Sequence, residues 1–265
     1  ELMHSWYQMV LGTNESLVAW MDEGYTSYAS TRIMDYLVRN KIIAGTPSDN
    51  PFQRVYAGYT RFTQSGAEEP LSTHADHFQT NSAYGMGSYT KGQIFLNQLE
   101  YVIGKPAFDR GLLRYFNTWK FKHPNANDFI RIMEKESGLE LDWYKEYMVN
   151  TTHTIDYAIE NIEAAGDSTL ITLRRIGLMP MPQDVIVQRK GGQPLAFTIP
   201  LTLMRGEKQE LWEGHPFQLL PDWPWTHPQY QFKIPVKHQD VEKIELDPSQ
   251  RVADVDLSNN IFPAN

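Results

Sequence analysis

The 265-residue chain contains no cysteine. Disulfide bonds are therefore excluded, and so is any metal site built on thiolates. A metal bound by these residues must be held by histidine and carboxylate side chains. The same absence leaves the redox compartment of the protein open.

Long apolar runs and concentrated positive charge are also missing. No apolar run reaches the roughly 18 residues that a membrane-spanning helix needs, so the sequence predicts no membrane span. The formal net charge is −8, and the 24 lysines and arginines form no basic cluster. Both features argue against nucleic acid as a partner and weakly favour neutral or cationic ligands.

What the chain does contain is enough apolar material for a packed core, with 41% hydrophobic residues. Its length suits one large domain or two ordinary ones. Near residue 150 the apolar pattern changes from helical spacing to short alternating runs. We therefore expect a multidomain α+β protein, with a mostly helical domain over residues 1–150 and an antiparallel β-sandwich over residues 151–265.

Apolar residues at helical spacing predict a series of helices in the first domain. The expected ranges are 1 to about 10, 16–39, 51–63, 89–103, 107–120, 127–137 and 141–149. The polar stretch 64–87 is expected to be a long loop beside a site. Its His74, Asp76 and His77 suit a second metal cluster or the polar rim of a cleft, and the rim is favoured because nothing in the sequence fixes their geometry.

Short β-rich runs separated by turn residues predict strands in the second domain. The expected ranges are 155–162, 169–174, 185–188, 197–203, 209–212, 231–236 and 241–246. The aromatic, proline-rich stretch from Pro221 to Pro228 suits either a surface that stacks on sugar or peptide, or a loop that caps the sandwich. The capping loop is favoured.

The start of the chain carries a pattern typical of zinc sites. Glu1-Leu-Met-His4 fills the last four places of His-Glu-x-x-His, which puts two imidazoles on one face of a helix with the glutamate beside them. The first histidine of that pattern would precede Glu1. Glu23 follows His4 after eighteen residues and is placed to be a third ligand. Three protein ligands and an open position for water are what catalytic zinc requires.

Two motifs in this order resemble the gluzincin zinc aminopeptidases, the aminopeptidase N family. One is Glu-x-x-His followed by Trp-x-x-Glu-Gly-x-x-x-Tyr, which runs here from Trp20 to Tyr28. The other is the family's Tyr-x-Lys-Gly segment, to which Tyr89-Thr-Lys-Gly92 is similar. The resemblance implies a thermolysin-like catalytic subdomain over residues 1–150.

The resemblance also implies roles for single residues. His4 and Glu23 would bind zinc, Glu1 would be the general base, and Tyr89 would donate a hydrogen bond to the oxyanion of the reacting amide. Tyr84 competes with Tyr89, but only Tyr89 is followed at the family's spacing by Lys-Gly.

The chain departs from the family pattern at two points. Asp22 stands where the family usually has asparagine before the third ligand. The family's Gly-x-Met-Glu-Asn segment, whose carboxylate binds the free α-amine of the substrate, does not occur in this sequence.

These features predict the C-terminal part of a zinc aminopeptidase, beginning inside His-Glu-x-x-His, that hydrolyses N-terminal residues from peptides. One alternative is a non-catalytic binding or scaffolding member of the same fold. Another is that the β-sandwich is an independent adhesion or sugar-binding domain. Because residues 1–265 alone supply an incomplete zinc site, we expect them to be inactive, to bind zinc weakly, and to self-associate through apolar surface that an upstream part would cover.

Overall fold

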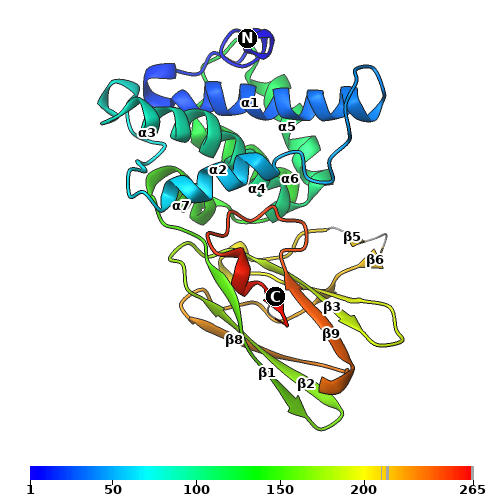
Figure 1. Ribbon diagram of the computed structural model, residues 1–265. Coiled ribbons are helices and arrows are strands. Elements are labelled where there is room, and N and C mark those ends of the chain that lie inside the picture. The colour runs from blue at the N-terminus through cyan, green and yellow to red at the C-terminus, as the bar shows by residue number, and fades with distance from the viewer. Residues whose placement is uncertain (210, 213–214, 264–265) are drawn as a thin grey trace. The chain divides into compact units, whose positions relative to one another are not determined.

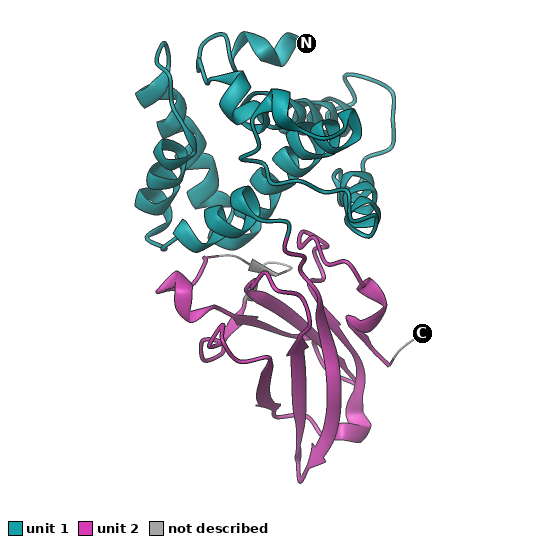
Figure 2. Ribbon diagram, turned by 90° about the vertical axis from the view of Figure 1, so that its left-hand side faces the viewer, with its two compact units in different colours: residues 1–152 teal, residues 153–265 magenta. Residues whose placement is uncertain are grey.

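The structure, a computed structural model, describes every residue except 210, 213–214 and 264–265, and it says nothing of the side chains of residues 210–216. The described chain divides into two units, Glu1–Thr152 and His153–Asn265 (Figure 2). Helices dominate the first unit and strands the second, so the protein is α+β (Figure 1). Among the described residues, none of the helices has the length and apolar character needed to cross a bilayer.

Most of the expected helices of unit 1 are confirmed. They are α1 (Glu15–Arg39), α2 (Gln53–Thr63), α4 (Gly92–Ile103), α5 (Lys105–Trp119), α6 (Ala126–Ser137) and α7 (Asp142–Asn150). Local sequence explains several of their ends. The Asn14 side chain accepts hydrogen bonds from the first amides of α1, and Asn125 forms a capping box with Asp128 at the start of α6. Gly138 ends α6 in the left-handed conformation, with φ 75°.

The expected helix over residues 1–10 is wrong. Only Leu2–Ser5 is helical, as a single 3-10 turn (η1), and Gln8 has a φ of 84°. One isolated turn gains few hydrogen bonds for the conformational entropy that it costs. The left-handed backbone at Gln8 then stops the turn from continuing as a right-handed helix.

The expected loop over residues 64–87 is also partly wrong. It contains a 3-10 turn at Ala75–His77 (η2) and a short helix α3 (Asn81–Gly85), and a π-helical turn at Met86–Lys91 (η3) leads directly into α4. The missed signal is Thr80, whose side chain accepts a hydrogen bond from the amide of Ala83 and so caps α3. Tyr89 therefore lies inside a continuous helical segment, not at the beginning of a helix.

Helices α1 and α4 touch through two glycines. A Cβ atom added to Gly24 would lie 2.6 Å from the Cα of Gly92, and one added to Gly92 would lie 2.8 Å from the Cα of Gly24. Since real Cβ atoms do not approach backbone this closely, the two helices pack at a distance that only glycine permits. Beside the crossing, the fully buried rings of Trp20 and Phe95 meet edge to face, with centroids 4.8 Å apart.

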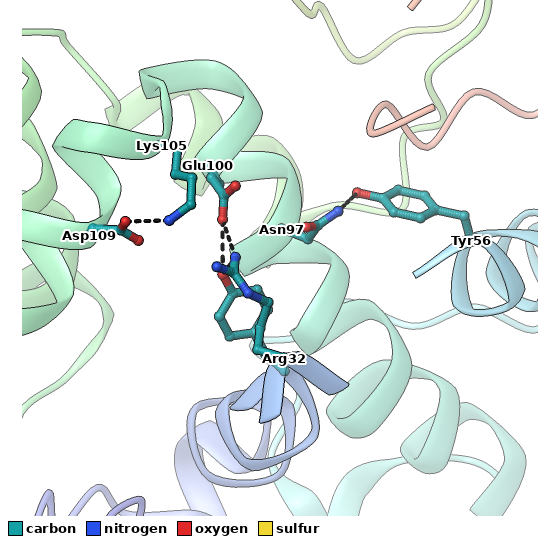
Figure 3. A network of polar contacts seen from close by, with 7 residues as sticks. Arg32, Tyr56, Asn97, Glu100, Lys105 and Asp109 are labelled. Carbon is teal, nitrogen blue, oxygen red and sulfur yellow. Dashed lines mark hydrogen bonds and ion pairs between the residues drawn. The ribbon is translucent and has the colours of Figure 1, made fainter. Parts of the chain in front are cut away.

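A polar network joins the same two helices farther along α1. Figure 3 shows Arg32 pointing towards Glu100, and an Arg32 guanidinium nitrogen lies 2.6 Å from a Glu100 carboxylate oxygen. The Tyr28 hydroxyl donates to the same oxygen at 3.0 Å. The side chain of Asn97 in α4 donates to the hydroxyl of Tyr56 in α2 at 3.0 Å (Figure 3). Helix α4 is thus fixed to two neighbours.

The described residues of unit 2 form two larger sheets and one small one. Their strands are β1 (Tyr157–Ala165), β2 (Ser168–Arg175), β3 (Gln183–Arg189), β4 (Leu195–Ile199), β5 (Leu211–Trp212), β6 (His215–Pro216), β7 (Gln218–Leu219), β8 (Gln229–Ile234), β9 (Val241–Leu246) and β10 (Ile261–Phe262). The sheet orders are β1-β2-β8, β10-β9-β3-β4-β7 and β5-β6. Neighbouring strands pair antiparallel except β4 and β7, which pair parallel over two residues.

Each of the seven expected strand ranges overlaps an observed strand, with two differences in detail. The range 197–203 ends as strand at Ile199 and continues as a 3-10 turn at Thr202–Met204, and residue 210 of the range 209–212 lies outside the described residues. The strands β6, β7 and β10 were not expected. Each has only two residues, which is too short for an alternating pattern to be visible.

Burial in unit 2 follows the alternation of the strands. In β8, Tyr230, Phe232 and Ile234 face inward while the residues between them are exposed. Trp223 is 1% exposed, stacks on Tyr230 and meets Tyr157 edge to face. This tryptophan of the proline-rich stretch is therefore part of the core, which favours the capping loop over a stacking surface.

The glycine contact between α1 and α4 makes a prediction about stability. Gly24→Ala or Gly92→Ala is expected to lower the free energy of unfolding by about 1–3 kcal/mol, because a methyl group must push two backbones apart. Urea unfolding of residues 1–265 measures the change.

Gly58→Ala is the matched control, since Gly58 is exposed in α2 and an added Cβ would meet nothing within 4 Å. It is expected to be neutral or to stabilise by up to about 1 kcal/mol through helix propensity. Equal stabilities for all three variants would show that the helices do not need the glycine contact.

Candidate metal and substrate site

His4 lies against the side chains of two carboxylates on α1. Its Nδ1 atom is 2.8 Å from Asp22 Oδ1, and its Nε2 atom is 3.4 Å from Glu23 Oε2. The hydroxyl of Thr26, one turn farther along α1, is 3.4 Å from Nδ1. The imidazole is therefore held by one ring nitrogen while the other faces Glu23.

The distance between His4 and Glu23 fits two ligands of one zinc ion. Zinc–nitrogen and zinc–oxygen bonds are both about 2.1 Å long, so two ligand atoms at a tetrahedral angle are separated by about 3.4 Å. The observed separation between Nε2 and Oε2 is 3.4 Å. Among the described residues, however, no set of three or more His, Cys, Asp or Glu side chains is arranged to hold a metal.

Asp22 is a part of the site that the motifs do not identify. In the sequence it is only a departure from the family pattern, whereas the structure makes it the partner of His4. A carboxylate on the second ring nitrogen fixes the tautomer and orientation of a metal-binding histidine. Burial raises the pKa of Asp22 to about 6, and the hydrogen bond with His4 opposes that rise.

Tyr89 reaches the same site from the π-helical turn η3. Tyr89 is 40% exposed and lines the pocket described below. Burial first, and then a hydrogen bond with Glu23, raise the pKa of Tyr89 above its ordinary value, which keeps the hydroxyl protonated and able to donate. Single π-helical turns within longer helical segments are common at functional sites.

Tyr84 lies beside Tyr89, with ring centroids 6.3 Å apart. Burial raises the pKa of Tyr84, and the nearby Glu23 and Asp22 charges add to the rise. A hydrogen bond between Tyr84 and Ser88 opposes it. Of the two tyrosines, Tyr89 lines the pocket together with Glu23, whereas Tyr84 is not among the residues that line it.

One pocket of about 480 Å³ brings the four expected site residues together. Glu1, His4, Glu23 and Tyr89 all line it. The other lining residues are Gln8, Met9, Glu15, Asp22, Thr26, Ser27 and Ser30. Its volume is in the range of small-molecule sites. The pocket makes the four residues neighbours, and their chemical roles stay predictions.

The cluster of His74, Asp76 and His77 is not part of this pocket. The three residues lie in or beside the turn η2, where His74 Nδ1 accepts a hydrogen bond from the amide of Asp76 at 3.1 Å. The two imidazole rings pack on each other, with centroids 4.8 Å apart. A nitrogen that accepts from a backbone amide is not free to bind a metal, so this geometry argues against a second metal cluster.

Comparison with known proteins gives a family match and several relatives. Residues 1–148 match the Peptidase family M1 domain. The chain is 22% identical over 215 residues to Probable aminopeptidase 1 of Sulfurisphaera tokodaii, covering 80% of this chain and 25% of that protein. It is 26% identical over 192 residues to human Endoplasmic reticulum aminopeptidase 2, covering 69% of this chain and 19% of that protein.

A solved structure shares the fold. The crystal structure of Legionella pneumophila aminopeptidase A in complex with aspartic acid matches with a TM-score of 0.60 at 11% identity, over 96% of this chain and 26% of that one. At this identity the likeness shows the fold alone. The chain spans about a quarter or less of the length of these relatives.

The arrangement of His4 and Glu23 makes a prediction about metal binding. A protein made of residues 1–265 alone is expected to bind zinc at least ~100-fold more weakly than a three-ligand catalytic site, because loss of an outer partner alone costs roughly 10 to 100-fold. Metal analysis after dialysis tests this. His4→Ala should remove what affinity remains, and one zinc retained per chain would contradict the prediction.

Proposed function

The chain belongs to the peptidase M1 family, and we propose that the protein which carries it is a zinc-dependent aminopeptidase that removes N-terminal residues from peptides. The observation that carries the proposal is the 3.4 Å separation of His4 Nε2 and Glu23 Oε2 in a pocket that also holds Glu1 and Tyr89. The aminopeptidases among the relatives support the same activity.

The donor set present here fits zinc. An imidazole nitrogen and a carboxylate oxygen are typical zinc ligands, and His4 and Glu23 present them at the separation that one tetrahedral ion requires. A histidine preceding Glu1 would complete three protein ligands. When bound, zinc supplies polarisation of the scissile carbonyl and activation of water near neutral pH. Asp22 holds the His4 ring in the orientation that binding needs.

Glu1 would transfer the protons of amide hydrolysis, and Tyr89 would stabilise the negative charge that develops on the carbonyl oxygen. The Glu1 carboxylate would take a proton from the attacking water and pass it to the leaving amine. The Tyr89 hydroxyl would donate a hydrogen bond to the oxyanion that forms on the carbonyl carbon, a contribution of about 3 kcal/mol for donors of this kind. Its position in the lining of the pocket, together with Glu23, supports this role.

For unit 2 we propose a β-sandwich formed by its two larger sheets. The proposal rests on contacts between residues of different sheets. Phe197 of β4 and Phe232 of β8 pack with ring centroids 5.7 Å apart. Ile171 of β2 and Val185 of β3 are fully buried. Two sheets that bury their apolar faces against each other give this layered architecture.

Replacing Glu1 tests the proposed base. In the whole protein, Glu1→Gln is expected to abolish turnover while zinc stays bound, because the variant loses the proton acceptor and keeps the ligands. Release of amino acids from short peptides and metal content are measured on the same sample. Retained activity would refute the role of Glu1. Absence of turnover in the unsubstituted protein with zinc bound would favour the alternative of a non-catalytic binding or scaffolding module.

Replacing Tyr89 tests the oxyanion donor. Tyr89→Phe is expected to lower kcat by ~100-fold or more with little change in KM, because the lost hydrogen bond forms only in the transition state. Tyr84→Phe is the matched control and is expected to leave kcat within about 3-fold, since Tyr84 does not line the pocket. A change mainly in KM would mean that Tyr89 positions the substrate instead.

A further inference from the structure

The π-helical turn that carries Tyr89 ends in a buried lysine. Lys91 is 1% exposed, which is rare for this residue type. Its Nζ atom lies 2.7 Å from Glu68 Oε1 and donates to the backbone carbonyl of Thr151 at 2.9 Å. The hydroxyl of Tyr59 donates to the same Glu68 oxygen at 2.8 Å. A buried charge is thus matched by an opposite charge and by further hydrogen bonds.

This arrangement is more than is needed to fill space. Replacing a buried ion pair by apolar side chains of similar size is often neutral or stabilising, so such a pair is weak evidence for a role in stability alone. What the pair does provide is a fixed orientation of the segments that it joins, since its hydrogen bonds form in one geometry only. Lys91 connects η3 with the segment after α2, through Glu68, and with the end of α7, through Thr151.

The residue after Lys91 also fixes the end of η3, through a close backbone contact. Gly92 rests on the backbone of α1 at Gly24, one position beyond the proposed ligand Glu23. Lys91 and Gly92 therefore fix the end of η3 against different neighbours, one through charge and one through close backbone contact. Tyr89 lies two residues before Lys91 in the same turn, so the direction of its side chain follows from how this turn is held.

From this geometry we propose that Lys91, paired with Glu68, is a positioning residue that holds the Tyr89 hydroxyl beside Glu23 for the reaction. Lys91 does not itself touch the pocket. The inference rests on the proposed function, because it assigns to Tyr89 the role of oxyanion donor.

The test uses a paired variant, Glu68→Gln with Lys91→Met, in the whole protein. Gln keeps an acceptor for Tyr59 and Met has nearly the length of Lys, so no unpaired charge is left in the core and the variant should fold. We expect kcat to fall by ~10-fold with KM changed less than about 2-fold, since only the donor is misplaced. In a Tyr89→Phe background the same pair should change kcat by less than about 2-fold, because the group on which it acts is gone.

Arg32→Met with Glu100→Gln is the matched control. It removes a different ion pair, the one that joins α1 and α4, and Gln again keeps an acceptor for the neighbouring Tyr28. This pair is expected to give no coupling to Tyr89→Phe. Additive losses for the Lys91 pair, or the same coupling for the control pair, would overturn the inference and leave Lys91 with a structural role.

A crystal structure of the Lys91 paired variant provides a readout that does not depend on activity. The Tyr89 hydroxyl is expected to move away from Glu23, whereas the control variant should keep it in place. An unsubstituted protein without peptidase activity would refute the proposed function. In that case a Tyr89 hydroxyl that stays in place in the Lys91 paired variant would also overturn the role of Lys91. A displaced hydroxyl would support the inference that Lys91 positions it.

Discussion

The close approach of α1 and α4 at Gly24 and Gly92 is the constraint on which the site depends. Glu23 immediately precedes one glycine, and Tyr89 lies three residues before the other. Because the two backbones touch, the side chains on either side of the contact are brought to one pocket. The Gly that follows Glu23 and the Gly that follows Lys91 thus have the same physical explanation. Each removes a Cβ atom that would keep the helices, and with them the reacting groups, apart.

Much of the helical unit could be predicted from sequence because its signals are local. Asn14, Asn125 and Gly138 mark helix ends, and apolar residues at helical spacing mark the faces that pack. The strands of unit 2 are equally visible where they alternate, as β8 does. Motif spacing predicts that His4, Glu23 and Tyr89 belong to one site, and all three side chains line the same pocket.

The features that sequence did not predict depend on tertiary contacts. The π-helical turn at Met86–Lys91 is an irregularity within a helix, and apolar spacing does not distinguish it from an α-helical turn. The partnership of Asp22 with His4 joins segments eighteen residues apart, and a residue adjacent to a ligand carries no sign of it. The expected helix over residues 1–10 rests on the motif and on apolar residues at helical spacing, and neither signal reveals the left-handed backbone at Gln8.

The 3-10 turn at Leu2–Ser5 gives the site two parts of unequal rigidity. The backbone hydrogen bonds of residues 1–9 join residues 1–11 to one another, whereas α1 is packed along its length against α4. Segments with few long-range bonds open at a lower free energy than the core. A ligand that bridges His4 and Glu23 would connect the less stable segment to the more stable one. Part of its binding free energy would then stabilise residues 1–9 against local opening. The amides of this segment would exchange more slowly with solvent, and this protection would increase with ligand concentration by mass action.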